Sequence, residues 1–404
     1  MQIEGLDRLV DLPGWLPDKV SFTDNVLRWE MHRDKRLNLE CPGCGKAMSL
    51  NRFTQHEVKD LAMGTAVRLV LCYQAPQGRC RGCPRYHTFH PPGVEAGSMT
   101  TVRYRQFVSL LCRKMTLADV AEIMGFAPST AYKIDFRFLC ETVPEPCFDG
   151  LECLLVDENS VRCGEMYVTL VLNARTGELL FQGQGRRSET LTEFFDKLTP
   201  AQKASIKAVC IDRSGAYRDS IEKNLPHADI VFDKFHLIAN YHAVLDEVRR
   251  KAWHDATVED KAFIKGQRYN LFRNIENLDV DMVLELDKLL RSNASISTAY
   301  QLRDQFKSIW NYKTPETIRA AVQQWIGLAT ASALEPVVRF AKNLGRCTEQ
   351  IAAYAKHRIT NGLMEGFNNK VSRLIHRANG IRSLVYLFLR LRAENSYRRV
   401  CGME

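Results

Sequence analysis

The sequence lacks any apolar run long enough to cross a bilayer. The longest one near the C-terminus, LVYLFL at 384–389, is far shorter than the about 20 residues that a membrane helix needs. Acidic residues interrupt every apolar stretch of the first 16 residues, MQIEGLDRLVDLPGWL, so we expect no signal peptide. Internal repeats and low-complexity tracts are absent too. These absences predict a soluble, cytoplasmic protein without a membrane partner.

A disulfide framework is also missing. The 13 cysteines are an odd number, and nine of them are scattered through apparent core or helical segments. Disulfide frameworks belong to small, cysteine-dense domains, whereas this chain has 404 residues, enough for two to four domains. The net charge of +9 favours a polyanionic partner, although a basic cytosolic enzyme without one fits the charge equally well.

The order of predicted elements indicates a multidomain protein of α+β and α/β class. Strands are expected at 26–32 and 66–71, then, after the breaker Pro91-Pro92-Gly93, a helical stretch. Beyond a second breaker at 144–146, three strands, a helix and two crossover strands follow, which is the order of an RNase H-like mixed sheet (153–157, 167–172, 179–181, 189–198, 208–212 and 230–232). We therefore predict five segments: a β-rich one, a helical one, a mixed-sheet one, an all-helical one, and a last one with basic helices (1–92, 93–148, 149–238, 239–355 and 356–404).

Two cysteine pairs predict a structural zinc site. Cys41-Pro42-Gly43-Cys44 and Cys80-Arg81-Gly82-Cys83 have the spacing that lets two thiolates on one tight turn bind a single metal. Two such knuckles supply four thiolates, which leaves the metal no open position, so the ion would support folding and not catalysis. Redox-active dithiols and disulfides are the alternatives, and His87 and His90 are substitute ligands that a fourth cysteine makes unnecessary.

Residues 117–134 fit a helix-turn-helix. Ala121 is small where two helices must pack closely, and Gly125 follows where the turn needs a positive φ. Pro128 suits the first position of the second helix. We expect Val120, Met124, Phe126, Ala131 and Ile134 to be buried. Ser129, Thr130, Tyr132, Lys133 and Arg137 would then be free to contact DNA. A plain helical hairpin is the alternative.

Two aspartates indicate a metal-dependent reaction. Asp157 and Asp212 each end an apolar strand, where a carboxylate is exposed at the rim of an α/β sheet. If the strands are neighbours, the acids lie side by side, and a shared divalent cation offsets their repulsion. An aspartate at a strand end is also a common turn former or helix cap. Glu158 would point to the other side of its strand and is the weaker candidate.

A third acid comes from the predicted helix around 360–374. Leu363, Phe367, Val371 and Leu374 form an apolar stripe, and Glu365, Asn368, Asn369 and Ser372 share the opposite face. The basic residues Lys370, Arg373, His376 and Arg377 follow, which favours a face turned toward phosphates. A solvated helix face is the alternative.

Together these motifs resemble a known family. The chain is similar to the DDE transposases of bacterial insertion sequences, most closely the zinc-ribbon-bearing ISL-three family. The resemblance covers nearly the whole chain and rests on the cysteine knuckles, the helix-turn-helix and three blocks: LVDE at 155–158, IDRSGAY at 211–217 leading to FDKFHL at 232–237, and NGLMEGFNNK at 361–370.

The resemblance implies a catalytic triad of Asp157, Asp212 and Glu365 that holds two Mg²⁺ ions, which Mn²⁺ could replace. Four residues would support the site (Asp233, His236, Asn369 and Lys370), and Arg373 and Arg377 would contact DNA. Such enzymes nick double-stranded DNA at the terminal inverted repeats and use the freed 3′-hydroxyl to attack target DNA. The resemblance also implies a homodimer, associated with the nucleoid through DNA.

Two other functions fit the same motifs. One is a DNA-binding repressor with a decayed catalytic domain, and the other is a structure-selective nuclease of the same fold. Trp253, Trp310 and Trp325 in the helical segment could stack on an unpaired base, although a tryptophan in a helix is more often part of the core.

Overall fold

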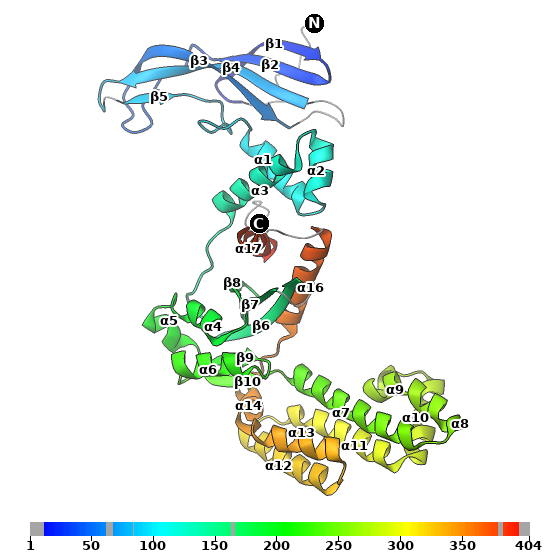
Figure 1. Ribbon diagram of the computed structural model, residues 1–404. Helices are drawn as coiled ribbons and strands as arrows, with labels where there is room; N and C mark the ends of the chain where they lie inside the picture. Colours follow the sequence, from blue (N-terminus) through cyan, green and yellow to red (C-terminus); the bar gives the residue numbers. More distant parts are fainter. Residues whose placement is uncertain (1–11, 62–67, 84, 163–165, 379–382, 396–404) are drawn as a thin grey trace. The chain divides into compact units, whose positions relative to one another are not determined.

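The computed structural model describes residues 12–61, 68–83, 85–162, 166–378 and 383–395 (Figure 1). It separates into two compact units, Met1–Pro144 with Ile375–Glu404, and Glu145–Leu374. The predicted last segment, 356–404, is thus divided between them. In the described ranges, no helix combines the length and apolarity that a membrane span requires.

The first unit begins with a five-stranded sheet. The order is β1-β2-β4-β3, with β5 paired to β4, and the strands are β1 (Trp15–Thr23), β2 (Val26–Arg33), β3 (Met48–Asp60), β4 (Arg68–Cys80) and β5 (Tyr86–Thr88). One face is apolar, with Trp29, Val58 and Leu71 buried in a single cluster. β2 matches the strand expected at 26–32. Of the strand expected at 66–71, residues 66 and 67 lie outside the described residues and the rest begins β4.

Three helices follow the sheet: α1 (Val102–Cys112), α2 (Leu117–Met124) and α3 (Pro128–Thr142). Thr116 caps α2 in a reciprocal arrangement with Asp119, and Gly125 ends the helix with φ +66°. Pro128 begins α3. The short turn arises because a left-handed residue ends one helix and a proline begins the next, as the sequence predicts. Val120 and Ala131 are buried, while Met124, Phe126 and Ile134 pack partly buried against the same cluster.

The second unit contains a mixed sheet with the strand order β10-β9-β6-β7-β8. β6, β7 and β8 are antiparallel, and β9 and β10 continue the sheet in parallel with β6. The elements are β6 (Cys153–Arg162), β7 (Met166–Asn173), β8 (Leu179–Gln184), α4 (Ser188–Phe195), α5 (Pro200–Ser205), β9 (Ala208–Ile211), α6 (Gly215–Asn224) and β10 (Asp229–Phe232). Three strands, helices and two crossover strands occur in the predicted order.

The chain is helical from Lys234 to His357. The main helices are α7 (Lys234–Asp255), α8 (Val258–Gly266), α9 (Arg268–Phe272), α10 (Val280–Ser292), α11 (Ala294–Ser308), α12 (Pro315–Ala331), α13 (Glu335–Gly345), α14 (Thr348–Ala352) and α15 (Tyr354–His357), followed by α16 (Gly362–Arg377) and α17 (Leu384–Asn395). Tyr241, Phe306, Trp325 and Phe340 pack in one aromatic cluster, with their rings tilted or edge-on to one another. The indole N–H of Trp325 donates to a backbone carbonyl at 2.8 Å, and both Trp325 and Trp310 are buried, so these two belong to the core.

Candidate functional site

Three aspartates come at the same level on neighbouring parallel strands of the second sheet. Leu155 of β6 pairs with Cys210 of β9, so Asp157 and Asp212 each follow that pair by two positions. Ile211 of β9 pairs with Phe232 of β10, so Asp212 and Asp233 each follow by one. The apolar runs before these acids are buried. The sheet therefore brings together acids from three separate segments.

Asp157 does not end its strand, contrary to the sequence-based expectation. β6 continues to Arg162 because its antiparallel pairing with β7 extends past Asp157, whereas its parallel pairing with β9 stops at Leu155. The apolar run ends at Asp157, but the backbone hydrogen bonding does not. Asp212 directly follows β9, as expected, and its carboxylate accepts the N–H of Ser214 at 2.9 Å. Asp212 thus also shapes the turn before α6.

The Asp157 carboxylate accepts two hydrogen bonds. Its Oδ1 accepts the backbone N–H of Glu158 at 2.8 Å, and its Oδ2 accepts the side-chain Nδ2 of Asn368, on α16, at 2.9 Å. Burial raises the pKa of Asp157, and the charge of Asp212 adds to this, against the opposing effects of those hydrogen bonds and of His236. A bound cation would relieve both causes.

Asp233 is 2% exposed and joins two helices. Its carboxylate caps α7 by accepting the His236 N–H at 3.3 Å, lies 2.9 Å from the ring Nδ1 of His236, and accepts the N–H of Asn361, just before α16, at 3.3 Å. Burial would raise the pKa of Asp233, but the hydrogen bonds from His236 and Asn361 outweigh it and lower the pKa. The hydrogen bond to Asp233 in turn raises the pKa of His236, with the charges of Asp157 and Asp212 adding to this.

Glu365 lies on the first turn of α16 and is exposed. In the ranges that the structure describes, the only group of three or more His, Cys, Asp or Glu side chains with ligand atoms all within 4.8 Å of one another is a set of four cysteines. The carboxylate oxygens of the three predicted catalytic acids are therefore not all within 4.8 Å of one another in this structure.

The buried face of α16 differs from the predicted stripe at one position. Met364 is fully buried, whereas Leu363 is 50% exposed, because the helix turns its buried side one residue further along. Phe367, Val371 and Leu374 are buried as expected. Three of the predicted polar residues of this helix are exposed (Asn369, Lys370 and Arg373), while Arg377 lies 3.6 Å from Glu394.

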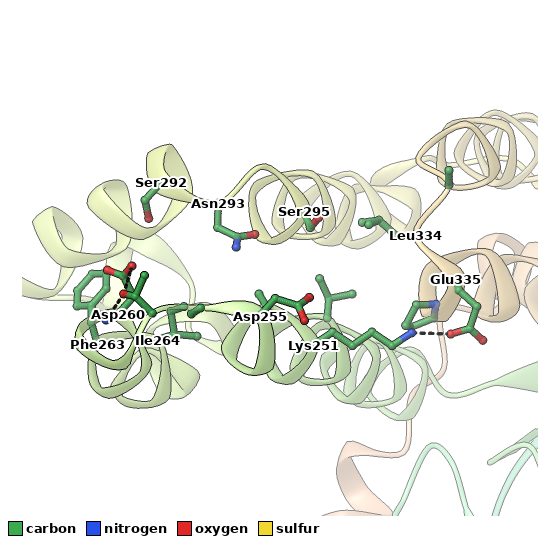
Figure 2. A pocket seen from close by; sticks show the side chains of 16 residues that line it. Lys251, Asp255, Asp260, Phe263, Ile264, Ser292, Asn293, Ser295, Leu334 and Glu335 are labelled. Carbon is green, nitrogen blue, oxygen red and sulfur yellow. Dashed lines mark hydrogen bonds and ion pairs between the residues drawn. The ribbon is translucent and has the colours of Figure 1, made fainter.

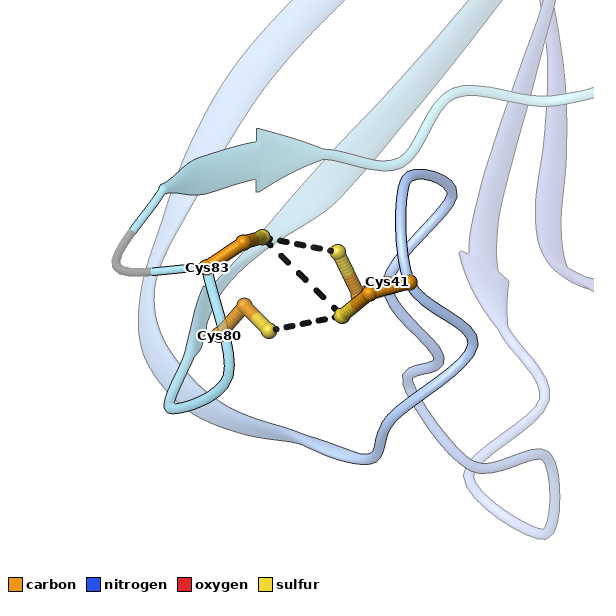
Figure 3. A group of neighbouring side chains, drawn as sticks. Cys41, Cys80 and Cys83 are labelled. Atoms are coloured by element: carbon orange, nitrogen blue, oxygen red, sulfur yellow. Dashed lines mark hydrogen bonds between the residues drawn. The ribbon is translucent and has the colours of Figure 1, made fainter.

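The four paired cysteines converge in the first unit (Figure 3). Met48 of β3 pairs with Cys80 of β4, so the antiparallel pairing brings the knuckle before β3 onto the knuckle after β4. The Sγ atoms are 3.4 Å apart for Cys41 and Cys83, 3.5 Å for Cys44 and Cys80, and 4.0 Å for Cys44 and Cys83. Tetrahedral zinc with Zn–S bonds of about 2.3 Å needs sulfurs about 3.8 Å apart, so the four donors fit that metal.

The thiols of this cluster differ in acidity. The backbone N–H groups of Cys83 and Gly82 lower the pKa of Cys80 to about 6, although burial opposes them. Hydrogen bonding to the thiols of Cys41 and Cys80 raises the pKa of Cys83 to about 12. Without a cation the four thiols cannot all ionise together, because each thiolate repels its neighbours.

The predicted DNA-contacting face of α3 is only partly open. Ser129, Lys133 and Arg137 are exposed, and Thr130 is half-buried. Arg137 lies 2.7 Å from Glu141 on the same helix.

Tyr132, predicted to contact DNA from that face, packs against other aromatic rings. Its ring stacks on Phe136 with centroids 5.6 Å apart and meets the ring of Tyr386, on α17, edge-on at 4.9 Å. The sequence predicts a basic helix at α17. It contains no signal that this helix packs on α3.

A buried polar network also links α3 to α17. Asp135, fully buried on α3, accepts the Tyr386 hydroxyl at 2.5 Å and a guanidinium N–H of Arg390 at 3.1 Å. Arg390 also donates to the carbonyl of Cys112. Sequence reasoning did not find these residues. The only signal was a polar residue at the position where helical spacing demands an apolar one.

A cavity of about 530 Å³ lies elsewhere, among helices α7, α8, α10, α11 and α13 (Figure 2). Lys251 donates to Glu335 at its wall, at 2.9 Å. Its walls are formed only by residues between 248 and 336, and none of the predicted catalytic or DNA-contacting residues is among them. The chemistry predicted from the sequence does not use it.

Comparison with known proteins identifies the class as transposases: a family model described as "Transposase" matches residues 154–391, which include the three predicted catalytic acids. The chain belongs to the ISL3 family of DDE transposases, which is the ISL-three family that its motifs resemble. It is 32% identical over 357 residues to the transposase for insertion sequence element IS1001 of Bordetella parapertussis, covering 87% of this chain and 88% of that protein. It is 27% identical over 307 residues to the transposase for insertion sequence element IS1557 of Mycobacterium tuberculosis, covering 70% of this chain and 69% of that protein.

Proposed function

We propose that this transposase binds the terminal inverted repeats of its insertion sequence, cleaves strands at the element ends with metal ions, and joins the freed 3′-hydroxyl to target DNA. The observation that carries the proposal is the register of Asp157 and Asp212 on neighbouring strands, with α16 hydrogen-bonded to Asp157. The strand order of that sheet supports an RNase H-like core, interrupted by the helical segment 239–355.

Asp157, Asp212 and Glu365 are the residues that would hold magnesium or manganese. Two such ions, when bound, supply an activated water and neutralise charge on the phosphate. The fit is chemical: hard carboxylate oxygens are the ligands these ions prefer, and Asp157 carries a burial penalty that a cation offsets. Glu365 precedes Asn368 by three residues on α16, so it emerges from the side of the helix that reaches Asp157.

The first unit is proposed to grip DNA. Ser129, Thr130, Lys133 and Arg137 on α3 would contact base edges and phosphates. Arg373 and Arg377 on α16 would make further contacts to phosphates. The four cysteines would hold one structural zinc ion. A homodimer would bring two element ends together, and binding to DNA would place the protein at the nucleoid.

The test is incubation of the full chain with labelled terminal-repeat duplex and Mg²⁺, followed by mapping of the products. We expect cleavage at the element end and, with target DNA, a joined product. Asp157→Ala, Asp212→Ala and Glu365→Ala should each abolish cleavage and retain end binding. Glu193→Ala, which removes an exposed acid on α4, is the matched control and should cleave as the parent does.

Three results would contradict the proposal. Loss of end binding in all three variants would make the acids structural. End binding by the parent without any cleavage would indicate a repressor with a decayed catalytic domain, and cleavage without joining would indicate a structure-selective nuclease.

A further inference from the structure

Two hydrogen bonds connect α16 and the residue before it to two aspartates of the second sheet, Asp157 and Asp233. At its start, the N–H of Asn361 donates to Asp233 at 3.3 Å. Further along, Nδ2 of Asn368 donates to Oδ2 of Asp157 at 2.9 Å. The first donor is a backbone N–H just before α16 and the second is a side-chain amide about two turns into the helix, so the two bonds hold α16 at two points along its length.

Glu365 lies between these two fastenings. Its N–H donates to the carbonyl of Asn361 at 2.8 Å, which places it on the first regular turn of the helix. It is three residues before Asn368, so these two side chains share one side of α16. Rotation or sliding of α16 would therefore move Glu365 relative to Asp157 and Asp212 together.

The start of α16 has few other polar restraints. Asn361 is 3% exposed, and among the residues that the structure describes its buried side-chain oxygen and nitrogen have no hydrogen-bond partner. The backbone bond to Asp233 is thus the main polar contact that fixes this turn. Asp233 is suited to that task because it is nearly fully buried and also caps α7, so it cannot move freely.

We propose that Asn368 and Asp233 are positioning residues that set where Glu365 can meet Asp157 and Asp212. Asp233 fixes the first turn of α16, and Asn368 ties the next turns to the Asp157 carboxylate. An amide suits this position because it donates to Asp157 without carrying a charge that would compete with a cation or repel the carboxylate. This inference rests on the proposed function, in which those three acids hold the metal.

The test measures metal binding separately from cleavage. Mn²⁺ is titrated into the full zinc-loaded chain, and free Mn²⁺ is followed by electron paramagnetic resonance. Asn368→Leu, which keeps a similar volume but removes the donor, should weaken Mn²⁺ binding about 10–100-fold, as loss of a ligand's hydrogen-bond partner does at metal sites. Cleavage should then need a correspondingly higher Mg²⁺ concentration, in a variant that circular dichroism shows to be folded. Asn368→Gln, which retains an amide donor, should recover part of the affinity.

Asn224→Leu is the matched control. Asn224 also donates a side-chain hydrogen bond within the second unit, to the carbonyl of Ser220 at 2.9 Å, but it lies at the end of α6. It should bind Mn²⁺ as the parent does. For Asp233, Asp233→Ala should speed hydrogen exchange in peptides covering 361–366, and unchanged exchange there would refute its role.

The outcomes separate this inference from the proposed function. If Asp157→Ala loses Mn²⁺ binding and cleavage but Asn368→Leu binds Mn²⁺ as tightly as the parent, the positioning role of Asn368 is wrong and the proposed function stands. If Asp157→Ala itself binds Mn²⁺ and cleaves like the parent, the proposed function fails, and the positioning inference fails with it.

Discussion

Asp157 and Asp212 stand two positions beyond the same residue pair, Leu155 with Cys210, on neighbouring parallel strands. This register brings the two aspartates to the same level of the sheet, with Asp157 inside β6 and Asp212 just after β9. Burial and the negative charge of Asp212 both disfavour ionisation of Asp157. The ionised form of Asp157 is therefore disfavoured in the protein alone, and a bound cation would favour it.

The first prediction follows from that raised pKa. A carboxyl group whose pKa is higher in the folded protein lowers the free energy of unfolding as pH rises above its unfolded value of about 3.9. At pH 7 without metal, Asp157→Asn should raise the unfolding temperature, by about 2–4 °C for each kcal/mol relieved. Mg²⁺ should stabilise the parent but not the variant. Calorimetric scans with and without Mg²⁺ measure both effects, and a variant that Mg²⁺ still stabilises would contradict the prediction.

The second prediction concerns the cysteine cluster. Cys41→Ser combined with Cys80→Ser should reduce zinc content from one ion per chain to none, and should unfold the sheet of the first unit because a structural zinc contributes directly to folding. Metal analysis and circular dichroism provide the measurements. Cys140→Ser with Cys147→Ser, which alters two exposed cysteines outside the cluster, is the control and should keep its zinc. Full zinc retention in the first variant would disprove the assignment.

The third prediction tests the network between α3 and α17. Asp135→Ala leaves the buried guanidinium of Arg390 without its counter-ion, so it should lower the free energy of unfolding by about 3–5 kcal/mol. Arg137→Ala on the same helix breaks two exposed pairs, with Glu141 and Glu95, and should cost no more than about 1 kcal/mol. Urea unfolding of the three proteins gives the comparison. Equal losses would mean that the network is not a major contributor.

The fourth prediction is a pH dependence. The hydrogen bond to Asp233 raises the pKa of His236, and the charges of Asp157 and Asp212 act in the same direction. A raised histidine pKa stabilises the fold fully below the unfolded value of about 6.5, and this contribution is lost as pH rises through the folded pKa. His236→Gln should therefore unfold at a lower temperature than the parent near pH 6, with the difference shrinking at higher pH. His227→Gln, at an exposed histidine, should show no such pH-dependent difference.

Local patterns predicted most of the individual elements. The strands of the second sheet, the turn at Gly125 and the two cysteine knuckles follow from apolar runs, special backbone positions and spacing, which depend on neighbours in sequence. Asp212 was placed correctly because β9 ends where its apolar run ends. Asp157 was not, because the length of β6 depends on its pairing with β7.

Partners that are distant in sequence could not be predicted. Helical spacing predicts an exposed position for Tyr132 on α3. In the structure its ring contacts Tyr386 of α17, which lies more than 200 residues further along the chain. Asn368 was recognised only as a polar residue on the correct face, since its hydrogen bond to Asp157 depends on where α16 meets the sheet. The burial of Met364 in place of the predicted Leu363 has the same origin. Packing fixes the rotation of a helix about its axis, whereas the sequence periodicity predicts that rotation only to within one residue.

The packing of α17 on α3 also constrains how the chain can fold during synthesis. The first unit joins residues up to Pro144 with residues from Ile375 onward, so its cluster of Leu139, Val143, Tyr386 and Ala393 stays incomplete until the whole second unit has left the ribosome. A nascent chain therefore carries α3 with an uncovered apolar side, and Asp135 without its partners on α17, for most of its translation, which exposes it to aggregation. Loss of the codons for α17 alone would leave that state permanent, even with Asp157, Asp212 and Glu365 intact.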